Sequence, residues 1–329
     1  MARQSNRDVI QTYRYLRGAM VALLLLLLFS VGYQWWSETA QSCWLGSISA
    51  YYYTPVRTVF VGSLFGLGAA LIAYQGHSAE EDVLLNFSGF MAFVVAMVPT
   101  VPDGSCATNG FTQTPAEIAI AVRNNVWSLF FVAVVAVVTV LTIKTIKNKG
   151  QAKPAVRPGK PAICIAVSCT VVLLAELALF VALPERFIAL SHGIAASTMI
   201  TGVIIVMVLS ALNVRTRHQG NTAQVSLYRN IYVVLAALLG LLLALSVGVS
   251  LAVSKFDHLI LIAEVIIIVL FGTYWVVQTY ELRNLFEPHR QANRAADDTT
   301  APAESAAEDL DEVAAADVAE ARKLEQVAQ

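Results

Sequence analysis

The chain alternates between long runs of apolar residues and short polar segments over most of its length. Each run holds about 20 residues, enough for an α-helix to cross the ~30 Å hydrocarbon core of a bilayer. Only helices and closed barrels satisfy every backbone hydrogen bond in lipid, so the pattern predicts an all-α, polytopic transmembrane bundle. We expect eight spans, at residues 18–33, 56–74, 84–101, 123–143, 162–182, 193–213, 231–253 and 259–279.

The first apolar run follows an arginine-containing polar segment, which is also the pattern of a secretory signal peptide. The bulky side chains of Trp35 and Trp36 come just after the run, whereas a cleavage site requires small residues. Tryptophan is common at the membrane interface. We therefore interpret residues 18–33 as an uncleaved first span with the two tryptophans at its outer end.

Composition supports the membrane class and separates a tail from the bundle. The 329 residues are 57% hydrophobic and 14% charged, whereas a soluble domain holds about 25% charged residues. Residues 288–329 contain 10 acidic and 4 basic residues, and the rest of the chain contains 13 acidic and 18 basic ones. We expect a cytoplasmic N-terminus at 1–17, an eight-helix domain at 18–280 and an acidic, largely disordered tail at 281–329.

Lysine and arginine gather in alternate loops. Residues 144–160 hold six of them, residues 214–230 hold three, and more follow the last span. The intervening loops hold few, all near span ends: Arg57, Arg123, Arg186 and Lys255. The 75–83 loop is an exception, because it has no basic residue. Since cytoplasmic loops carry the excess of basic residues, we expect a protein of the bacterial inner membrane with both termini in the cytoplasm.

Two ionisable side chains lie inside predicted spans, where a charge is costly and is by default a sign of function. Glu176 and Glu264 are each about six residues from the outer end of their span, which places both roughly 9 Å below the outer surface at 1.5 Å per residue. We expect Glu264 to pair with Arg57 or Arg123, or to line a wet cavity without a charge. Either glutamate could instead pair with an arginine only to hold helices together.

Further polar and aromatic residues lie at the same outer rim. These candidate ligand contacts are Tyr52, Arg57, Arg123 with Asn124 and Asn125, and His192. The inner halves of the spans hold little that is comparable, so the sequence predicts a polar cavity open to the outer side. Simpler interpretations stay open, because the arginines could reach lipid phosphates and the tyrosines could form an interfacial belt.

Cys43 and Cys106 fall in the first and second outer loops, in the oxidising compartment where disulfides persist. A bridge between them is one prediction, and two free thiols are the alternative, because spacing alone does not give geometry. Cys164 and Cys169 are five residues apart in the fifth span and do not share a helix face. We interpret this second pair as packing residues.

The sequence contains no motif typical of a catalytic site. Gly-x-Ser-x-Gly, a glycine-rich phosphate loop and His-Glu-x-x-His are all absent. His192 and His258 with a glutamate could build a metal site, which is the least favoured option. We therefore expect a protein that is not an enzyme and that uses no cofactor or metal. The basic 144–160 segment is expected to contact anionic lipid rather than nucleic acid.

Two stretches of the chain resemble a known group. They are SISAYYYTPVRTVFVG at 47–62, and RNIY at 229–232 followed by Glu264 and by FGTYW at 271–275. They resemble a family of bacterial multi-spanning membrane proteins without an established activity and, more distantly, the DRAM-like membrane proteins. The resemblance is good over 45–100, looser over 225–280 and absent in the tail. It implies a shared fold with recurrent Arg57 and Glu264, and it implies no activity.

The leading functional hypothesis is a membrane protein that binds a small or lipidic ligand from the outer side, as a transporter or in envelope assembly. One alternative is a sensor or scaffold that binds a cytoplasmic protein through its acidic tail. Another is an intramembrane metal-dependent hydrolase. Membrane lipids are the expected partners, and the sequence predicts no oligomeric state.

Overall fold

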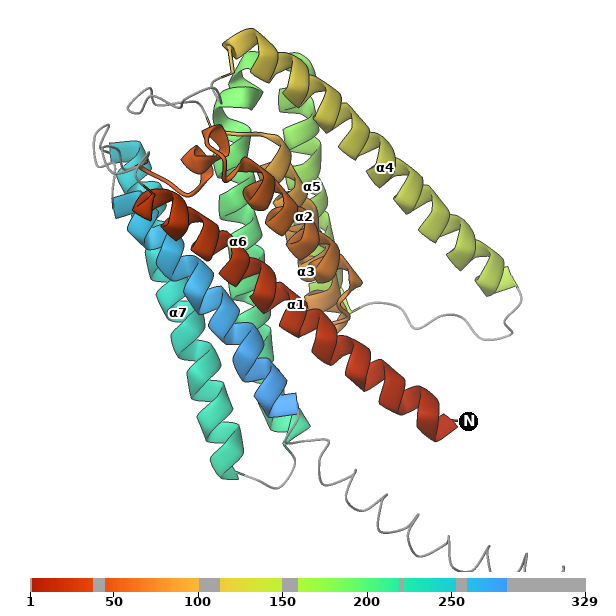
Figure 1. The fold of residues 1–329 in the computed structure, drawn as a ribbon. Helices are drawn as coiled ribbons and strands as arrows, with labels where there is room; N and C mark the ends of the chain where they lie inside the picture. Colours follow the sequence, from red (N-terminus) through yellow and green to blue (C-terminus); the bar gives the residue numbers. More distant parts are fainter. Residues whose placement is uncertain are drawn as a thin grey trace, which may run out of the picture. The chain divides into compact units, whose positions relative to one another are not determined.

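The computed structural model describes residues 2–37, 45–100, 113–149, 159–218, 222–252 and 259–282, and every regular element within them is helical. In chain order the elements are α1 (Ala2–Trp36), the 3₁₀ helix η1 (Ser49–Tyr53), α2 (Arg57–Ala73), α3 (Ala79–Met97), α4 (Pro115–Lys149), α5 (Lys160–Ala182), α6 (Pro184–Arg217) and α7 (Thr222–Ala252) (Figure 1). One more helix, called the last helix below, covers Leu259–Leu282 and is drawn in blue. Residues up to Val277 form one compact unit, and the contacts described below lie within it.

The eight α-helices lie at the eight predicted positions, which confirms an all-α bundle of the membrane-protein type. Six of them are long and apolar enough to cross a bilayer, namely α1, α4, α5, α6, α7 and the last helix. The other two differ, because α2 has only 17 residues and α3 carries three acidic residues in its first turn. The predicted tail begins at residue 281, and the part of it beyond Leu282 lies outside the described residues.

Local signals extend several helices beyond their apolar runs. α4 begins at Pro115 rather than near residue 123, because Thr114 and Glu117 form a capping box. Thr114 Oγ1 accepts the Glu117 N–H at 3.3 Å, and Glu117 Oε2 accepts the Thr114 N–H at 2.8 Å. Proline suits the first helical position, since the missing N–H would have no partner there. α6 also begins with a proline, Pro184, and Leu183 alone separates it from α5.

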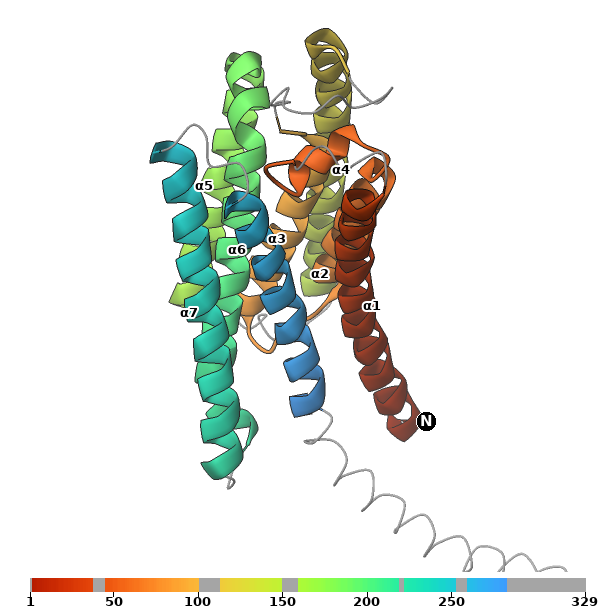
Figure 2. The same cartoon turned by 60° about the vertical axis from the view of Figure 1, so that its left-hand side comes forward.

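α3 packs most extensively against α2 and α6, while α1 covers α2 and α7 packs on α6 (Figure 2). Glycine permits the closest of these contacts. A Cβ added at Gly68 of α2 would lie 2.6 Å from the carbonyl oxygen of Gly89 in α3, and one added at Gly89 would lie 2.5 Å from the oxygen of Gly68. The two backbones therefore touch, as is common where small residues meet between membrane helices.

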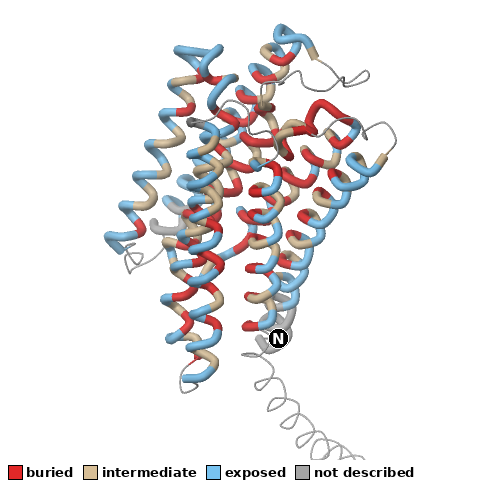
Figure 3. The backbone as a smooth tube through the Cα atoms, turned by 90° about the vertical axis from the view of Figure 1, so that its left-hand side faces the viewer, coloured by how far each residue is buried: buried red, intermediate tan, exposed pale blue. Residues whose placement is uncertain are grey.

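α4 joins the bundle only near its start. Its buried residues there, Ile118, Val122, Val126 and Leu129, follow the helical period. Its later large apolar residues, from Phe131 to Ile146, are exposed, and Figure 1 shows this half of α4 diverging from the other helices. Buried positions instead concentrate where the other helices meet (Figure 3). Such an extended apolar surface suits contact with lipid chains.

Candidate functional site

The chain between α1 and α2 is a compact buried segment. Residues 45–56, called the tyrosine segment below, contain η1 with Tyr51, Tyr52 and Tyr53 at 3–5% exposure. The Tyr53 hydroxyl donates a 2.7 Å hydrogen bond to the carbonyl oxygen of Thr100, just beyond α3. Burial raises the pKa of Tyr53 to about 12, so this hydroxyl is a neutral donor near pH 7. The three tyrosines are therefore core residues and do not form an interfacial belt.

Glu264 of the last helix makes a further hydrogen bond to the tyrosine segment. Its Oε2 accepts the backbone N–H of Ile48 at 2.6 Å. That N–H lies at the start of η1, where a helix cannot supply an acceptor for it. The expected ion pair of Glu264 with Arg57 or Arg123 is not formed, because Arg57 has a different partner and Arg123 is exposed on α4.

Arg57 begins α2 and turns back over the tyrosine segment. Its Nη2 donates a 2.7 Å hydrogen bond to the Tyr52 hydroxyl, and its guanidinium carbon lies 4.4 Å from the centre of the Tyr52 ring. A cation over an aromatic face is attracted by the ring quadrupole, so the two contacts fix the guanidinium in place. Arg57 and Tyr52 are the two predicted site residues that the fold brings into direct contact.

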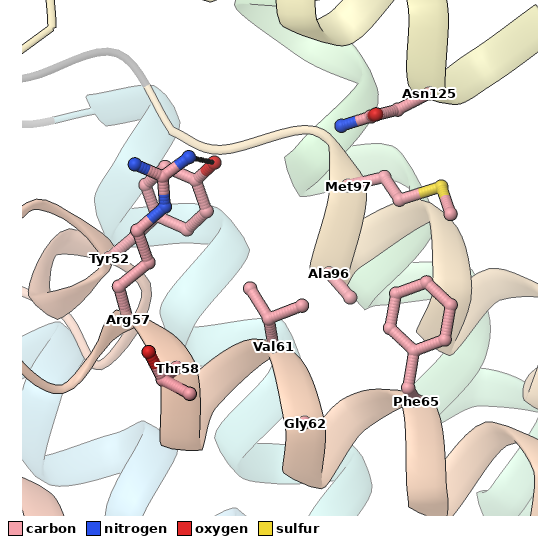
Figure 4. A pocket seen from close by; sticks show the side chains of 9 residues that line it. All are labelled: Tyr52, Arg57, Thr58, Val61, Gly62, Phe65, Ala96, Met97 and Asn125. Atoms are coloured by element: carbon pink, nitrogen blue, oxygen red, sulfur yellow. Dashed lines mark hydrogen bonds between the residues drawn. The ribbon is translucent and has the colours of Figure 1, made fainter.

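A pocket of about 560 Å³ opens beside this pair. We call it the Arg57 pocket. It is lined by Tyr52, Arg57, Thr58, Val61, Gly62 and Phe65 from the tyrosine segment and α2, by Ala96 and Met97 from α3, and by Asn125 from α4 (Figure 4). Arg57 and Tyr52 lie at one edge, Asn125 lies across the pocket from them, and most of the other lining residues are apolar. Ligand pockets in proteins have this size and this mixture of surfaces.

Asn125, rather than Arg123, is the residue that α4 contributes to the pocket. The two are separated by two positions, which turns them to different sides of a helix. Arg123 and Asn124 are exposed, and Asn125 is partly buried against the bundle. The buried positions Val122 and Val126 mark the inward face of α4, so the apolar period was the signal that could have distinguished Asn125.

Glu176 and His192 lie outside the pocket and tie helices together. The Ser191 hydroxyl of α6 donates to Glu176 Oε2 of α5. His192 Nδ1 makes a 2.6 Å hydrogen bond with the carbonyl oxygen of Val98 at the end of α3. Both side chains are buried, but the Oε1 atom of Glu176 has no hydrogen-bond partner in the described part of the chain. Their observed contacts thus connect α3, α5 and α6.

A second buried polar cluster lies at the other ends of the helices, and the expectation that this half holds nothing comparable is wrong. Arg17 Nη1 of α1 donates to the Tyr74 hydroxyl at 3.0 Å. Glu81 Oε2 accepts the His77 N–H at 2.7 Å, and its Oε1 accepts Asn213 Nδ2 at 3.2 Å. The sequence did not reveal this cluster because its members come from helix ends that are far apart in the chain.

Glu81 precedes the apolar part of α3 and is almost fully buried. Burial alone would raise the pKa of its carboxyl group. The hydrogen bonds from His77 and Asn213 and the nearby imidazole outweigh that effect and lower the pKa below its usual value. Glu81 is therefore an ionised anchor for the loop between α2 and α3.

Two other predictions concern cysteines and metal ligands. Cys43 and Cys106 lie outside the described residues, so their bridge stays a prediction. Cys164 is exposed, Cys169 is partly buried, and both are free. Among the described residues no group of three or more His, Cys, Asp or Glu side chains could hold a metal ion. His258 is not among the described residues.

Comparison with known proteins gives no relative. No protein-family model, no curated protein and no solved structure matches this chain. The resemblance of its tyrosine segment to bacterial membrane proteins therefore stays a prediction.

Proposed function

We propose that this integral membrane protein binds a small or lipidic ligand in the Arg57 pocket. The observation that carries the proposal is the pocket itself, with a fixed cation at one edge and mostly apolar side chains along the rest of its lining. By the distribution of basic loops this end of the bundle faces the outside of the cell. The role is ligand binding, in transport or in envelope assembly.

Arg57 is available to a ligand. A guanidinium has five N–H donors, and in the described part of the chain the Tyr52 hydroxyl accepts from one nitrogen while no carboxylate lies within ion-pair distance. The side chain is only partly buried. A cation that served only to hold helices together would be expected to face a carboxylate. Arg57 instead faces an open pocket.

The test fills the pocket without disturbing the helix. Gly62 lines the pocket, and a Cβ added there meets nothing within 4 Å. Gly62→Phe therefore places a ring in the empty space. Gly32→Phe on α1 is the matched control, because a Cβ at Gly32 also meets nothing within 4 Å and Gly32 is not a pocket residue.

Occupancy is measured in vesicles that contain phosphatidylcholine with a diazirine in its acyl chain. After irradiation, adducts on Val61, Phe65 and Met97 are divided by adducts on the exposed half of α4, which contacts bulk lipid. We expect the ratio to fall several-fold in Gly62→Phe and to stay unchanged in Gly32→Phe. A ratio that Gly62→Phe leaves at the wild-type level would show that no lipid chain enters the pocket, against the proposal.

The same measurement separates ligand binding from a role of the tail. Deleting residues 288–329 should leave the adduct ratio unchanged if the pocket is the functional site. A sensor that works through its tail would instead lose its signalling activity when the tail is deleted, and that activity would not depend on the pocket.

A further inference from the structure

We infer that the ligand of the Arg57 pocket is an anionic amphiphile: a phosphate or carboxylate group bound at Arg57, with a hydrocarbon chain along α2 and α3. This inference rests on the proposed function and names the class of ligand. Its first support is charge. The residues that line the pocket include one cation, Arg57, and no acidic residue.

The edge at Arg57 suits an oxyanion in particular. The planar guanidinium offers paired N–H donors whose spacing matches two oxygens of a phosphate or carboxylate. Thr58 and Asn125 add a hydroxyl and an amide on the same pocket. Figure 4 shows the Asn125 amide across the pocket from Arg57, with Val61 between them. A head group bound at Arg57 would meet no competing carboxylate among the lining residues.

The rest of the pocket suits a hydrocarbon chain. Val61 and Phe65 project from α2, Ala96 and Met97 lie opposite on α3, and Gly62 leaves a gap in the α2 surface. The apolar wall continues beyond the pocket, because the Phe65 ring lies 5.1 Å from that of Phe93. A free inorganic anion would leave this wall in contact with water, which is unfavourable for apolar surface.

The chain of such a ligand could enter from the bilayer. α4 packs on the bundle through its first turns only, and its large apolar side chains from Phe131 to Ile146 are exposed. α4 has its main contact with α3 and no comparable contact with α2. The apolar end of the pocket therefore lies next to helix surfaces that are open to lipid, while its charged edge lies near the start of α2, where head groups would be.

The experiment compares two photoreactive lipids that differ only in the head group. Phosphatidylglycerol and phosphatidylcholine, each with the same diazirine chain, are added separately at a low fraction to phosphatidylcholine vesicles. We expect phosphatidylglycerol to label Val61, Phe65 and Met97 about five- to tenfold more than phosphatidylcholine, relative to labelling of α4. Arg57→Gln should bring the ratio of the two lipids close to one, and Arg57→Lys should retain part of it.

Tyr52→Phe controls for disturbance of the tyrosine segment. It removes the hydroxyl that accepts from Arg57 but keeps the ring and the cation, so it should keep most of the phosphatidylglycerol preference. If Tyr52→Phe abolishes the preference as fully as Arg57→Gln does, the preference comes from packing of the segment and not from the charge. The assignment of Arg57 as the head-group contact is then wrong.

Competition identifies the source of the anion. If unlabelled oleate lowers the labelling of the pocket, free carboxylate amphiphiles bind there. If oleate leaves the labelling unchanged, the site is assigned to phospholipid head groups. Either result agrees with an anionic amphiphile as the ligand. Displacement by inorganic phosphate alone would overturn the amphiphile. Equal labelling by both lipids in the wild type, still reduced by Gly62→Phe, would overturn the anionic class and leave the proposed function intact. Labelling by neither lipid above the Gly62→Phe level would overturn both.

Discussion

The hydrogen bond between Ile48 and Glu264 is expected to hold the tyrosine segment in its place. Glu264→Leu removes the only acceptor that the described structure gives to the Ile48 N–H, and Glu264→Gln keeps a neutral acceptor of the same shape. Global stability is a poor measure of this bond, because leucine is also more favourable than glutamate in an apolar setting. The informative quantity is the local opening of the segment.

The size of the effect follows from the bond that is lost. A buried donor left without a partner costs about 1–3 kcal/mol. Since about 1.4 kcal/mol corresponds to tenfold in an equilibrium constant, Glu264→Leu should raise the open population about 30-fold at a cost near 2 kcal/mol. Glu264→Gln, which keeps an acceptor for this N–H, should raise it by a smaller factor.

Hydrogen exchange of single amides measures this population. The reporters are the N–H groups of Tyr51, Thr54 and Arg57, each bonded to a carbonyl oxygen within the segment at 3.0–3.1 Å. Glu176→Leu is the matched control, because it removes a carboxyl group that bonds to Ser191 and not to the segment. We expect faster exchange at all three reporters in the order wild type, Glu264→Gln, Glu264→Leu, with no change in Glu176→Leu.

Exchange at the wild-type rate in Glu264→Leu would refute the reasoning, because the segment would then be held by its other contacts alone. A less than additive effect of changing both Glu264 and Arg57 would not be evidence for a direct ion pair between them. Each contacts the tyrosine segment, one through Ile48 and the other through Tyr52. A less than additive double variant is therefore expected from the shared segment itself.

Three further predictions follow from other parts of the fold. Gly89→Ala should lower the thermal unfolding temperature in detergent, because the added methyl group meets the Gly68 carbonyl at 2.5 Å and overpacking costs about 1–3 kcal/mol. Gly240→Ala should leave that temperature unchanged, because nothing lies within 4 Å of a Cβ added there, and an equal effect of both changes would contradict the close α2–α3 contact. Glu81→Gln should be less stable than the wild type near pH 7. This difference in stability should shrink as the pH falls through and below the lowered pKa of Glu81, since a depressed carboxyl pKa adds stability only while the group is ionised. A difference that stays constant from pH 7 to pH 3 would show that Glu81 does not act through its charge. Cysteine at Ala116 should react with a membrane-impermeant reagent on intact cells, and cysteine at Thr216 should react only after lysis, each above the level of the unsubstituted chain; the reverse result would overturn the predicted orientation.

The sequence by itself determined the helices. Apolar runs of membrane length leave the backbone no alternative to helices or a closed barrel, so all eight helices could be placed without the fold. Their first residues were placed less well, because hydropathy ignores caps. The Thr114–Glu117 capping box and the proline at the start of α6 were readable signals that set those ends earlier.

Only the tertiary structure decided the partners. Glu264 was identifiable as an ionisable group in an apolar run, but its partner is the backbone N–H of Ile48, and a backbone group has no signature in the sequence. Glu81 and Asn213 meet although 132 positions separate them, because α3 and α6 pack side by side. The pocket has the same origin: Arg57, Met97 and Asn125 come from three helices, and only the packing of α2, α3 and α4 makes them neighbours.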